Sequence, residues 1–246
     1  MSSPVLELRG ASKAFASIPV LQGVDLCVYE GETVAILGGS GTGKSVMLKA
    51  MIGLLRLDSG VLRFRGRDVT RLSEREWATL RRHFGMVFQG AALFDSMSVH
   101  DNVAYPMREH SSLAAGEIPE RVGERLSWVG LEGVESKLPA ELSGGMRKRV
   151  GIARAIALDP EVMLYDEPTT GLDPANARRI GELVRDLQTR LRVTSVVVTH
   201  DLDLCFGVAD RVGLLAEGRL VIVDTPERFR ASHEPLVREF LGGVAS

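Results

Sequence analysis

The chain has 246 residues, of which 45% are hydrophobic and 25% charged, and its formal net charge is −2. This length and composition are typical of one soluble globular domain with a large core, or of one domain with an inserted lobe. The nearly balanced charge argues against a nucleic-acid-binding surface.

The first residues lack the basic and apolar regions of a signal peptide, and no apolar run is long enough to cross a membrane. We therefore expect any membrane role to depend on a partner, from the cytoplasmic side. Cys27 and Cys205 lie far apart without the spacing of a metal site, so we expect buried thiols in a reducing compartment.

Two strands are expected near the start of the chain. Residues 5–8 alternate apolar and polar side chains, and residues 20–29 contain a second strand that ends at a turn. Phe15 lies between them. Its ring could stack on an adenine base, or it could pack in a small core, and the sequence leaves both interpretations open.

A glycine-rich stretch follows that fits the phosphate-binding pattern G-x-x-x-x-G-K-[ST]. Its residues are Gly38, Gly39, Ser40, Gly41, Thr42, Gly43, Lys44 and Ser45. Residues 32–37 predict a buried strand entering this loop and residues 46–51 a helix leaving it. The glycines and the helix N-terminus direct N–H groups toward one point. We expect Lys44 to reach the β- and γ-phosphates and Ser45 to bind Mg²⁺. The alternative is a glycine-rich turn with a surface lysine.

Between the P-loop helix and residue 89 we expect two more strands with a helix between them. Residues 58–60 predict a turn and residues 61–65 a strand. Ser73 and Glu76 have the spacing of a capping box at the start of a helix. A short apolar strand then ends at Gln89, which could face a nucleotide, although on its own a loop position is the more frequent role.

Residues 90–158 carry helical patterns and no strand signal, so we expect a helical lobe inserted in an α/β core. A capping box at Ser98 opens a helix to about Met107, and residues 119–128 and 146–158 predict two more. The third is preceded by residues 142–146, Leu-Ser-Gly-Gly-Met, with Ser143 at the N-cap position. The backbone N–H groups at the N-terminus of this helix could bind a phosphate. The alternative is a capped helix with a solvated basic first turn, which is unusual because basic residues are disfavoured there.

A mainly apolar strand at residues 161–165 ends in Asp166 and Glu167. Adjacent carboxylates at the end of a buried strand are costly unless they are used or exposed. We expect Asp166 to bind the same Mg²⁺ as Ser45, as a Walker B residue, and Glu167 to orient the attacking water as a base. The alternative is a pair of carboxylates in a turn.

The last third returns to alternating helices and strands. Asp173 caps a helix that begins at Pro174. The strand at 194–199 ends at His200, which could contact a γ-phosphate or simply precede the next helix. Strands at 211–215 and 220–223 and a helical tail at 226–241 follow. With the P-loop and the acidic pair at strand ends, this order predicts a mainly parallel α/β sheet that binds its ligand at that edge.

Together these motifs resemble those of ABC transporter ATPase subunits over essentially the whole chain. The matching residues are Phe15 of the A-loop, the Walker A loop at 38–45, Gln89 of the Q-loop, the signature at 142–146, Asp166 and Glu167 of Walker B, the D-loop at 171–173 and the switch His200. The resemblance implies an α/β fold: a P-loop NTPase (RecA-like) ABC ATPase core with an N-terminal antiparallel β subdomain and an inserted α-helical subdomain. The single domain would comprise a nucleotide-binding core at 1–89 and 159–246 and the helical subdomain at 90–158.

The resemblance also implies roles for individual residues, with ATP and Mg²⁺ as cofactors. Catalytic roles fall to Lys44, Gln89, Glu167 and His200. Contacts with ATP are implied for Phe15, Gly38, Gly39, Ser40, Gly41, Thr42, Gly43, Lys44, Ser45, Ser143, Gly144, Gly145 and Asp173. Those implied for Mg²⁺ are Ser45, Gln89 and Asp166. Two cassettes would sandwich two ATP molecules, each P-loop facing the signature of the other subunit.

One residue of the signature departs from the usual family pattern and points to a subgroup of the family. The signature of most relatives ends in Gln, whereas here it ends in Met146. A signature ending in Met, the stretch at 94–109 and the closing stretch at 237–242 resemble the bacterial Mla and Mce lipid-transport ATPases and their chloroplast lipid-import relatives. Met146 is therefore consistent with a working site.

The expected function is ATP binding and hydrolysis that energise an integral-membrane permease for phospholipid or a related lipid. Expected partners are a second copy of the chain, permease subunits, and lipid-binding and small accessory subunits, with no nucleic acid, at the cytoplasmic face of the inner membrane. Alternatives are the ATPase of another ABC system, such as a polar amino-acid importer, or a non-transport ABC ATPase. A third is a regulatory subunit without turnover, which the presence of Glu167 and His200 disfavours.

Overall fold

The computed structural model describes residues 3–111 and 113–243, which belong to two compact units. The first unit contains the chain up to Thr79 and from Thr194 onward, and the second is Leu80–Val193. The expected helical lobe at residues 90–158 falls inside the second unit, and its status as a separate subdomain stays a prediction. None of the helices in the described part of the chain is long and apolar enough to cross a membrane.

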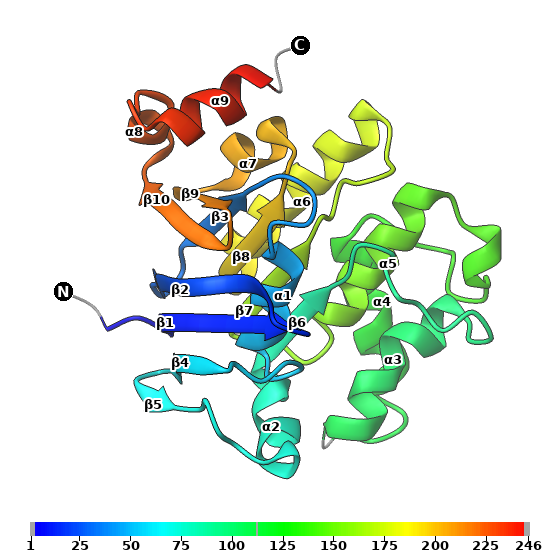
Figure 1. The fold of residues 1–246 in the computed structure, drawn as a ribbon. Coiled ribbons are helices and arrows are strands. Elements are labelled where there is room, and N and C mark those ends of the chain that lie inside the picture. Colours follow the sequence, from blue (N-terminus) through cyan, green and yellow to red (C-terminus); the bar gives the residue numbers. More distant parts are fainter. Residues whose placement is uncertain (1–2, 112, 244–246) are drawn as a thin grey trace. The chain divides into compact units, whose positions relative to one another are not determined.

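The first unit begins with an antiparallel sheet (Figure 1). Its strands, in the spatial order β2-β1-β4-β5, are β2 Ile18–Val28, β1 Leu6–Phe15, β4 Ser59–Phe64 and β5 Arg67–Asp68. Strand β1 is longer than the expected residues 5–8, because it pairs with β2 on one side and β4 on the other. A two-residue turn at Ala16 and Ser17, both with positive φ, joins β1 to β2, as short hairpins favour. The expected N-terminal antiparallel subdomain is confirmed.

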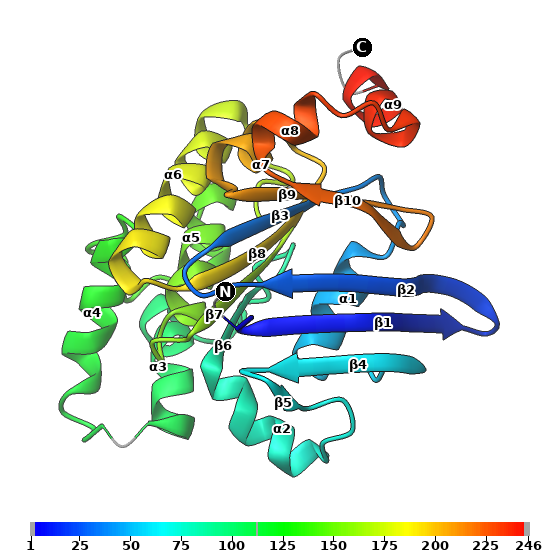
Figure 2. The ribbon, with the colours of Figure 1, turned by 90° about the vertical axis from the view of Figure 1, so that its left-hand side faces the viewer.

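A second set of strands in this unit is mainly parallel, and its strands are labelled in Figure 2. The strands, in the spatial order β10-β9-β3-β8, are β10 Arg219–Asp224, β9 Arg211–Ala216, β3 Thr33–Leu37 and β8 Thr194–Thr199. Strand β3 lies parallel to both β8 and β9, and all its residues are buried. A strand covered on both faces needs a continuous apolar run, which is what residues 34–37 provide. The helices of this unit are α1 Lys44–Met51, α2 Glu74–Leu80 at the unit's edge, α7 Leu202–Val208, α8 Pro226–Arg230 and α9 Pro235–Gly243.

The second unit combines two parallel strands with helices. The strands are β6 Phe84–Val87 and β7 Val162–Asp166; the helices are α3 Val99–His110, α4 Ile118–Trp128, α5 Gly144–Ala155 and α6 Pro174–Leu191, with short 3₁₀ turns at Arg81–His83 and Pro139–Glu141. As expected, none of the described residues between β6 and β7 forms a strand. Helix α3 continues beyond the expected Met107 to His110. Pro106 lies inside it and removes one N–H donor, but it does not end the helix. Helix α5 begins earlier than expected, directly after its cap at Ser143.

The segment before α3 is held by one buried amide. Asn102 has no exposed surface, and its Oδ1 accepts a 2.8 Å hydrogen bond from the N–H of Phe94. Its Nδ2 lies 3.1 Å from the carbonyl oxygens of Phe94 and Met97 and 3.0 Å from that of Ser98. Ser98 also caps α3 by accepting a hydrogen bond from the N–H of Asp101. Residues 94–98 are therefore an ordered loop, because their polar backbone groups have partners.

We predict that Asn102→Ala lowers the free energy of unfolding by about 1–3 kcal/mol, because it leaves the N–H of Phe94 and three carbonyl groups without their shared partner. Chemical denaturation of the purified chain measures this. Glu109→Ala is the control: Glu109 is exposed on the same helix, so its replacement should change the free energy by less than about 0.5 kcal/mol. Equal stability of both variants would contradict the role given to Asn102.

Candidate functional site

The P-loop connects β3 to α1 in the first unit, and two of its glycines are required by close contacts. Gly43 has φ +104°, and a Cβ there would lie 2.8 Å from the carbonyl oxygen of Val20. A Cβ on Gly38 would lie 2.6 Å from the carbonyl oxygen of Leu215. Real side chains do not tolerate either distance. The loop therefore packs its backbone tightly against β2 and β9, and the N-cap residue of α1, Gly43, makes no side-chain cap hydrogen bond.

Lys44 is the first residue of α1 and is only 6% exposed. Its Nζ donates hydrogen bonds to the carbonyl oxygens of Gly38 at 2.6 Å and Gly39 at 2.9 Å. The first turn of α1 contains no acidic residue, so no carboxylate of that turn neutralises the positive end of the helix dipole. A buried cation at a helix N-terminus is a favourable environment for an anion such as phosphate.

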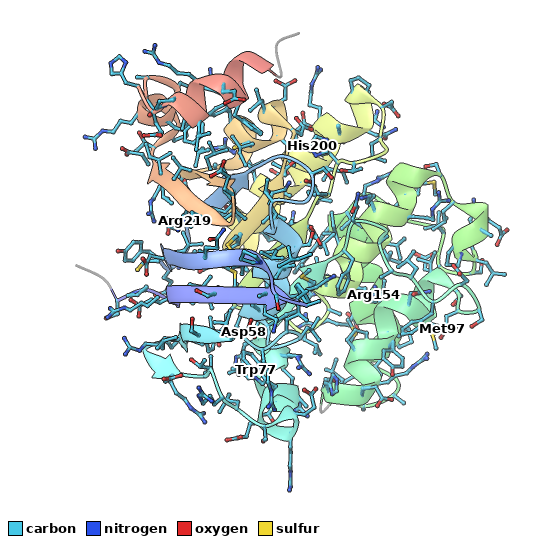
Figure 3. All side chains as sticks on the ribbon, in the orientation of Figure 1. Asp58, Trp77, Met97, Arg154, His200 and Arg219 are labelled. Atoms are coloured by element: carbon cyan, nitrogen blue, oxygen red, sulfur yellow. The ribbon has the colours of Figure 1, made fainter. Side chains whose placement is uncertain are left out.

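Two other expected site residues belong to the first unit. Leu37 pairs with Thr199 across parallel strands, so Gly38 and His200 follow their strands at the same edge of the sheet (His200 is labelled in Figure 3). His200 is exposed there, immediately before α7. Phe15 is 44% exposed at the end of β1, with the Lys13 ammonium 5.5 Å from its ring centroid. Its hairpin partner strand carries Val20, against which Gly43 packs, so the hairpin reaches the P-loop side of the unit.

The expected carboxylates lie in the second unit, at one edge of its parallel strands. Val87 pairs with Tyr165, so Gln89 and the pair Asp166 and Glu167 leave the strands on the same side. Asp166 is 5% exposed and Glu167 8% exposed. Glu167 has a left-handed backbone with φ +48°, and its Oε2 lies 3.4 Å from the Oγ1 of Thr170. Buried adjacent carboxylates and strained backbone are costly, and such costs concentrate at functional sites.

Lys148 is a residue that the sequence did not single out as functional. It is 6% exposed on α5, and its Nζ donates to the carbonyl oxygen of Gln89 and, at 3.3 Å, to that of Glu167. Burial lowers the pKa of its amine, while the nearby charges of Glu167 and Asp166 act in the opposite direction. The sequence signal that could have pointed to Lys148 is the basic run of Arg147, Lys148 and Arg149 near the start of α5.

The signature segment forms the N-terminus of α5, as expected. The Oγ of Ser143 accepts a 3.3 Å hydrogen bond from the N–H of Met146, and Ser143 is exposed. Arg147 turns back to donate to the carbonyl oxygen of Leu142 at 2.5 Å, which explains how a basic residue is tolerated in the first turn. A Cβ on Gly145 would lie 3.1 Å from the side chain of Asn176. Gly145 therefore lets the first turn of α5 approach Asn176 closely.

Asp173 caps α6, and its Oδ1 accepts a 3.0 Å hydrogen bond from the N–H of Asn176. This bond and the one from the Asn176 side chain lower the pKa of the Asp173 carboxyl. The capping role predicted for Asp173 is confirmed. A contact between Asp173 and ATP stays a prediction.

The described residues contain no group of three or more His, Cys, Asp or Glu side chains that could hold a metal ion. Mg²⁺ does not need such a group, because it binds through one or two carboxylates, phosphate oxygens and water. Asp166 provides one such carboxylate, and the roles of Asp166 and Ser45 toward Mg²⁺ stay predictions. Both cysteines are free thiols, and burial raises the pKa of the Cys205 thiol to about 12.

Comparisons with known proteins agree on the family of this chain. A family model described as ABC transporter matches residues 21–170. The probable ribonucleotide transport ATP-binding protein mkl of Mycobacterium tuberculosis is 43% identical over 97% of this chain, which spans 66% of that protein's length. MlaF of Escherichia coli, an intermembrane phospholipid transport system ATP-binding protein, is 37% identical over 98% of this chain and 90% of its own length.

A solved structure has the same fold. It is the ATP-binding cassette MJ0796, as a dimer in a post-hydrolysis state bound to ADP and Pi, with a TM-score of 0.84 and 31% identity. The match covers 89% of this chain and 98% of that one. The expected α/β fold of a P-loop ABC ATPase is therefore confirmed.

We predict that Lys44→Met weakens ATP binding about 10- to 100-fold, because it removes a charge-assisted contact with phosphate. Equilibrium binding of a fluorescent ATP analogue to the purified chain measures the change. Lys49→Met is the matched control, since Lys49 lies in the last turn of the same helix and its loss should leave affinity within about twofold. Unchanged affinity in Lys44→Met would remove Lys44 from the phosphate site.

Proposed function

Because this chain belongs to the ABC transporter family, as one of its ATPase cassettes, we propose that it powers a membrane permease that moves phospholipid or a related lipid. The observation that carries the ATPase part is a P-loop with a buried lysine in one unit and a buried Asp–Glu pair at a strand end in the other. The ATPase would act at the cytoplasmic face of the membrane, held there by the permease.

Each site residue has a defined task in this proposal. The P-loop N–H groups and Lys44 bind the β- and γ-phosphates, and Phe15 stacks on the adenine. Ser45, Asp166 and Gln89 hold Mg²⁺, which supplies charge neutralisation on the phosphates. Glu167 takes the proton of the attacking water, and His200 contacts the γ-phosphate. Burial of Glu167 serves this task, because a dry carboxylate interacts more strongly with the reacting groups.

The second unit contributes a signature that acts on another copy of the chain. We place Ser143, Gly144, Gly145 and Asp173 against the ATP bound at the P-loop of a second copy. Two observations support this arrangement: Ser143 is exposed at a helix N-terminus with no acidic residue in its first turn, and the similar cassette MJ0796 is dimeric. ATP would then close the dimer and hydrolysis would open it, so the differential affinity of the two states for ATP moves the permease.

The lipid assignment rests on the subgroup resemblance. Met146 and the stretch at 94–109 match the Mla and Mce type, and MlaF aligns over 90% of its own length. A second candidate is a nucleotide or another polar solute, because mkl is named for ribonucleotide transport. We favour lipid, since the chain accounts for only 66% of mkl and the name of mkl describes that longer protein.

The permease contact is proposed at the surface formed by Phe94 and Tyr105. These rings are 42% and 39% exposed, with centroids 5.1 Å apart, and the guanidinium of Arg154 lies 5.6 Å from the Phe94 ring centroid. The loop follows Gln89 closely and is held by Asn102. Exposed aromatic rings on an ordered loop and the adjoining helix α3 are suited to anchoring a partner, and Gln89, which precedes this loop, would sense the nucleotide.

We predict that Glu167→Gln retains ATP binding but lowers hydrolysis about 10²- to 10⁴-fold, because an amide does not accept the proton of water. Phosphate release by the assembled complex, together with ATP-dependent dimerisation of the variant, measures this. Hydrolysis at the wild-type rate would exclude Glu167 as the base. A wild-type complex that binds ATP without releasing phosphate would support the regulatory alternative instead.

We predict that Phe94→Asp leaves folding and ATP binding intact but lowers affinity for the permease by about 30-fold or more, as loss of a central aromatic anchor does. Co-purification with the permease measures assembly. Leu138→Asp is the control, because Leu138 is 43% exposed in the same unit outside this surface. Assembly that is normal in Phe94→Asp, or equally weak in both variants, would contradict docking at Phe94.

A further inference from the structure

Helix α5 presents one face to the segment that follows β6. Lys148, Gly151 and Arg154 recur every three residues, so they share a side of the helix. A Cβ on Gly151 would lie 3.3 Å from the Cβ and the carbonyl oxygen of Ala91. The Nη2 of Arg154 donates to the carbonyl oxygen of Ala91 at 3.0 Å (Arg154 is labelled in Figure 3). The helix that begins at the signature is therefore packed along the residues next to Gln89.

Lys148 also connects this face of α5 to the end of strand β7, which Glu167 follows. Its Nζ donates to the carbonyl oxygen of Gln89 and to that of Glu167, and it is buried. A lysine suits this position because one ammonium carries three donors and serves two carbonyl groups at once. The same side chain thus connects three parts of the second unit: helix α5, which begins at the signature, the Q-loop residue Gln89, and Glu167.

The two backbone segments that Lys148 holds are both strained. Glu167 has φ +48°, and Ala91 and Ala92, just beyond Gln89, have φ +61° and +49°. Residues with side chains adopt such angles only where surrounding contacts enforce them. Thr170 adds one contact, since its N–H donates to the carbonyl oxygen of Glu167 at 3.3 Å. The backbone of Glu167 therefore depends on partners outside its own strand.

We propose that Lys148 is a positioning residue for ATP hydrolysis, which fixes the backbone of Glu167 relative to that of Gln89 and to the signature helix. The inference rests on the proposed function, because it gives Glu167 the task of taking a proton from water. Lys148 contacts neither ATP nor water in this role. It sets where the Glu167 carboxylate stands, so its loss slows the chemical step and leaves binding at the P-loop, a different unit, unaffected.

The neighbouring Arg149 provides a control of matched chemistry. Its Nη1 also donates to two backbone carbonyl oxygens, those of Val129 at 3.1 Å and Gly130 at 2.9 Å. Burial lowers the pKa of the Arg149 guanidinium, as it does for the Lys148 amine. Both cations hold a loop against α5, but only Lys148 holds the loops of Gln89 and Glu167. A purely structural role predicts the same behaviour for both residues.

The experiment compares Lys148→Met, Lys148→Gln, Lys148→Arg and Arg149→Met with wild type in the assembled complex. We expect Lys148→Met to lower kcat for ATP about 10- to 100-fold, as misplacement of a catalytic group does, with KM within about twofold. Lys148→Gln keeps an uncharged amide NH₂ with two donors and should show a smaller loss, and Lys148→Arg should recover most of kcat. Arg149→Met should retain kcat. In the nucleotide-free chain, amide hydrogen exchange at residues 89–92 and 167–170 should rise in Lys148→Met and not in Arg149→Met.

Wild-type kcat in both Lys148→Met and Lys148→Gln would overturn the proposal. So would an equal fall of kcat in Arg149→Met, or a raised KM with unchanged kcat. If Lys148→Met does not fold, Lys148→Gln and Lys148→Arg decide by the same criteria. A wild-type complex that hydrolyses no ATP would overturn the proposed function and this inference with it, whereas wild-type turnover with unaffected variants overturns the inference alone.

Discussion

In each unit, a buried lysine ammonium on a helix donates to backbone carbonyl groups of loops that follow a strand. Lys44 donates to Gly38 and Gly39 in the first unit, and Lys148 donates to Gln89 and Glu167 in the second. A buried cation without partners is very costly, so each lysine constrains the loop whose carbonyls it needs. These two constraints shape the loops that would bind phosphate and carry the catalytic carboxylate.

Parallel strands do the remaining positioning within each unit. The register of β3 with β8 brings Gly38 and His200 to one edge, and that of β6 with β7 brings Gln89 and the acidic pair to one edge. Parallel α/β sheets bind ligands at the carboxyl ends of their strands for this reason. The glycine contacts at positions 38 and 43 then press the P-loop against its neighbours.

Features of this protein that depend on local chemistry were predictable from the sequence, and those that depend on distant partners were not. The caps at Ser73, Ser98, Ser143 and Asp173 were expected because a capping residue acts within three positions of itself. The extent of β1, which requires β2 and β4 on either side, was not. The buried Asn102 and Lys148 were missed for the same reason, since their partners are carbonyl groups that have no sequence signature. The site roles came largely from resemblance: Phe15, Gln89 and His200 each have an ordinary structural interpretation when taken alone.

We propose above that ATP hydrolysis by this chain moves lipid. The most direct measurement is to purify the native complex with its permease, identify any bound lipid by mass spectrometry, and reconstitute it between donor and acceptor membranes. We expect phospholipid or a related lipid to co-purify and its transfer to require hydrolysable ATP. A complex that carries a ribonucleotide, an amino acid or another polar solute, with no lipid bound or moved, would contradict the lipid assignment.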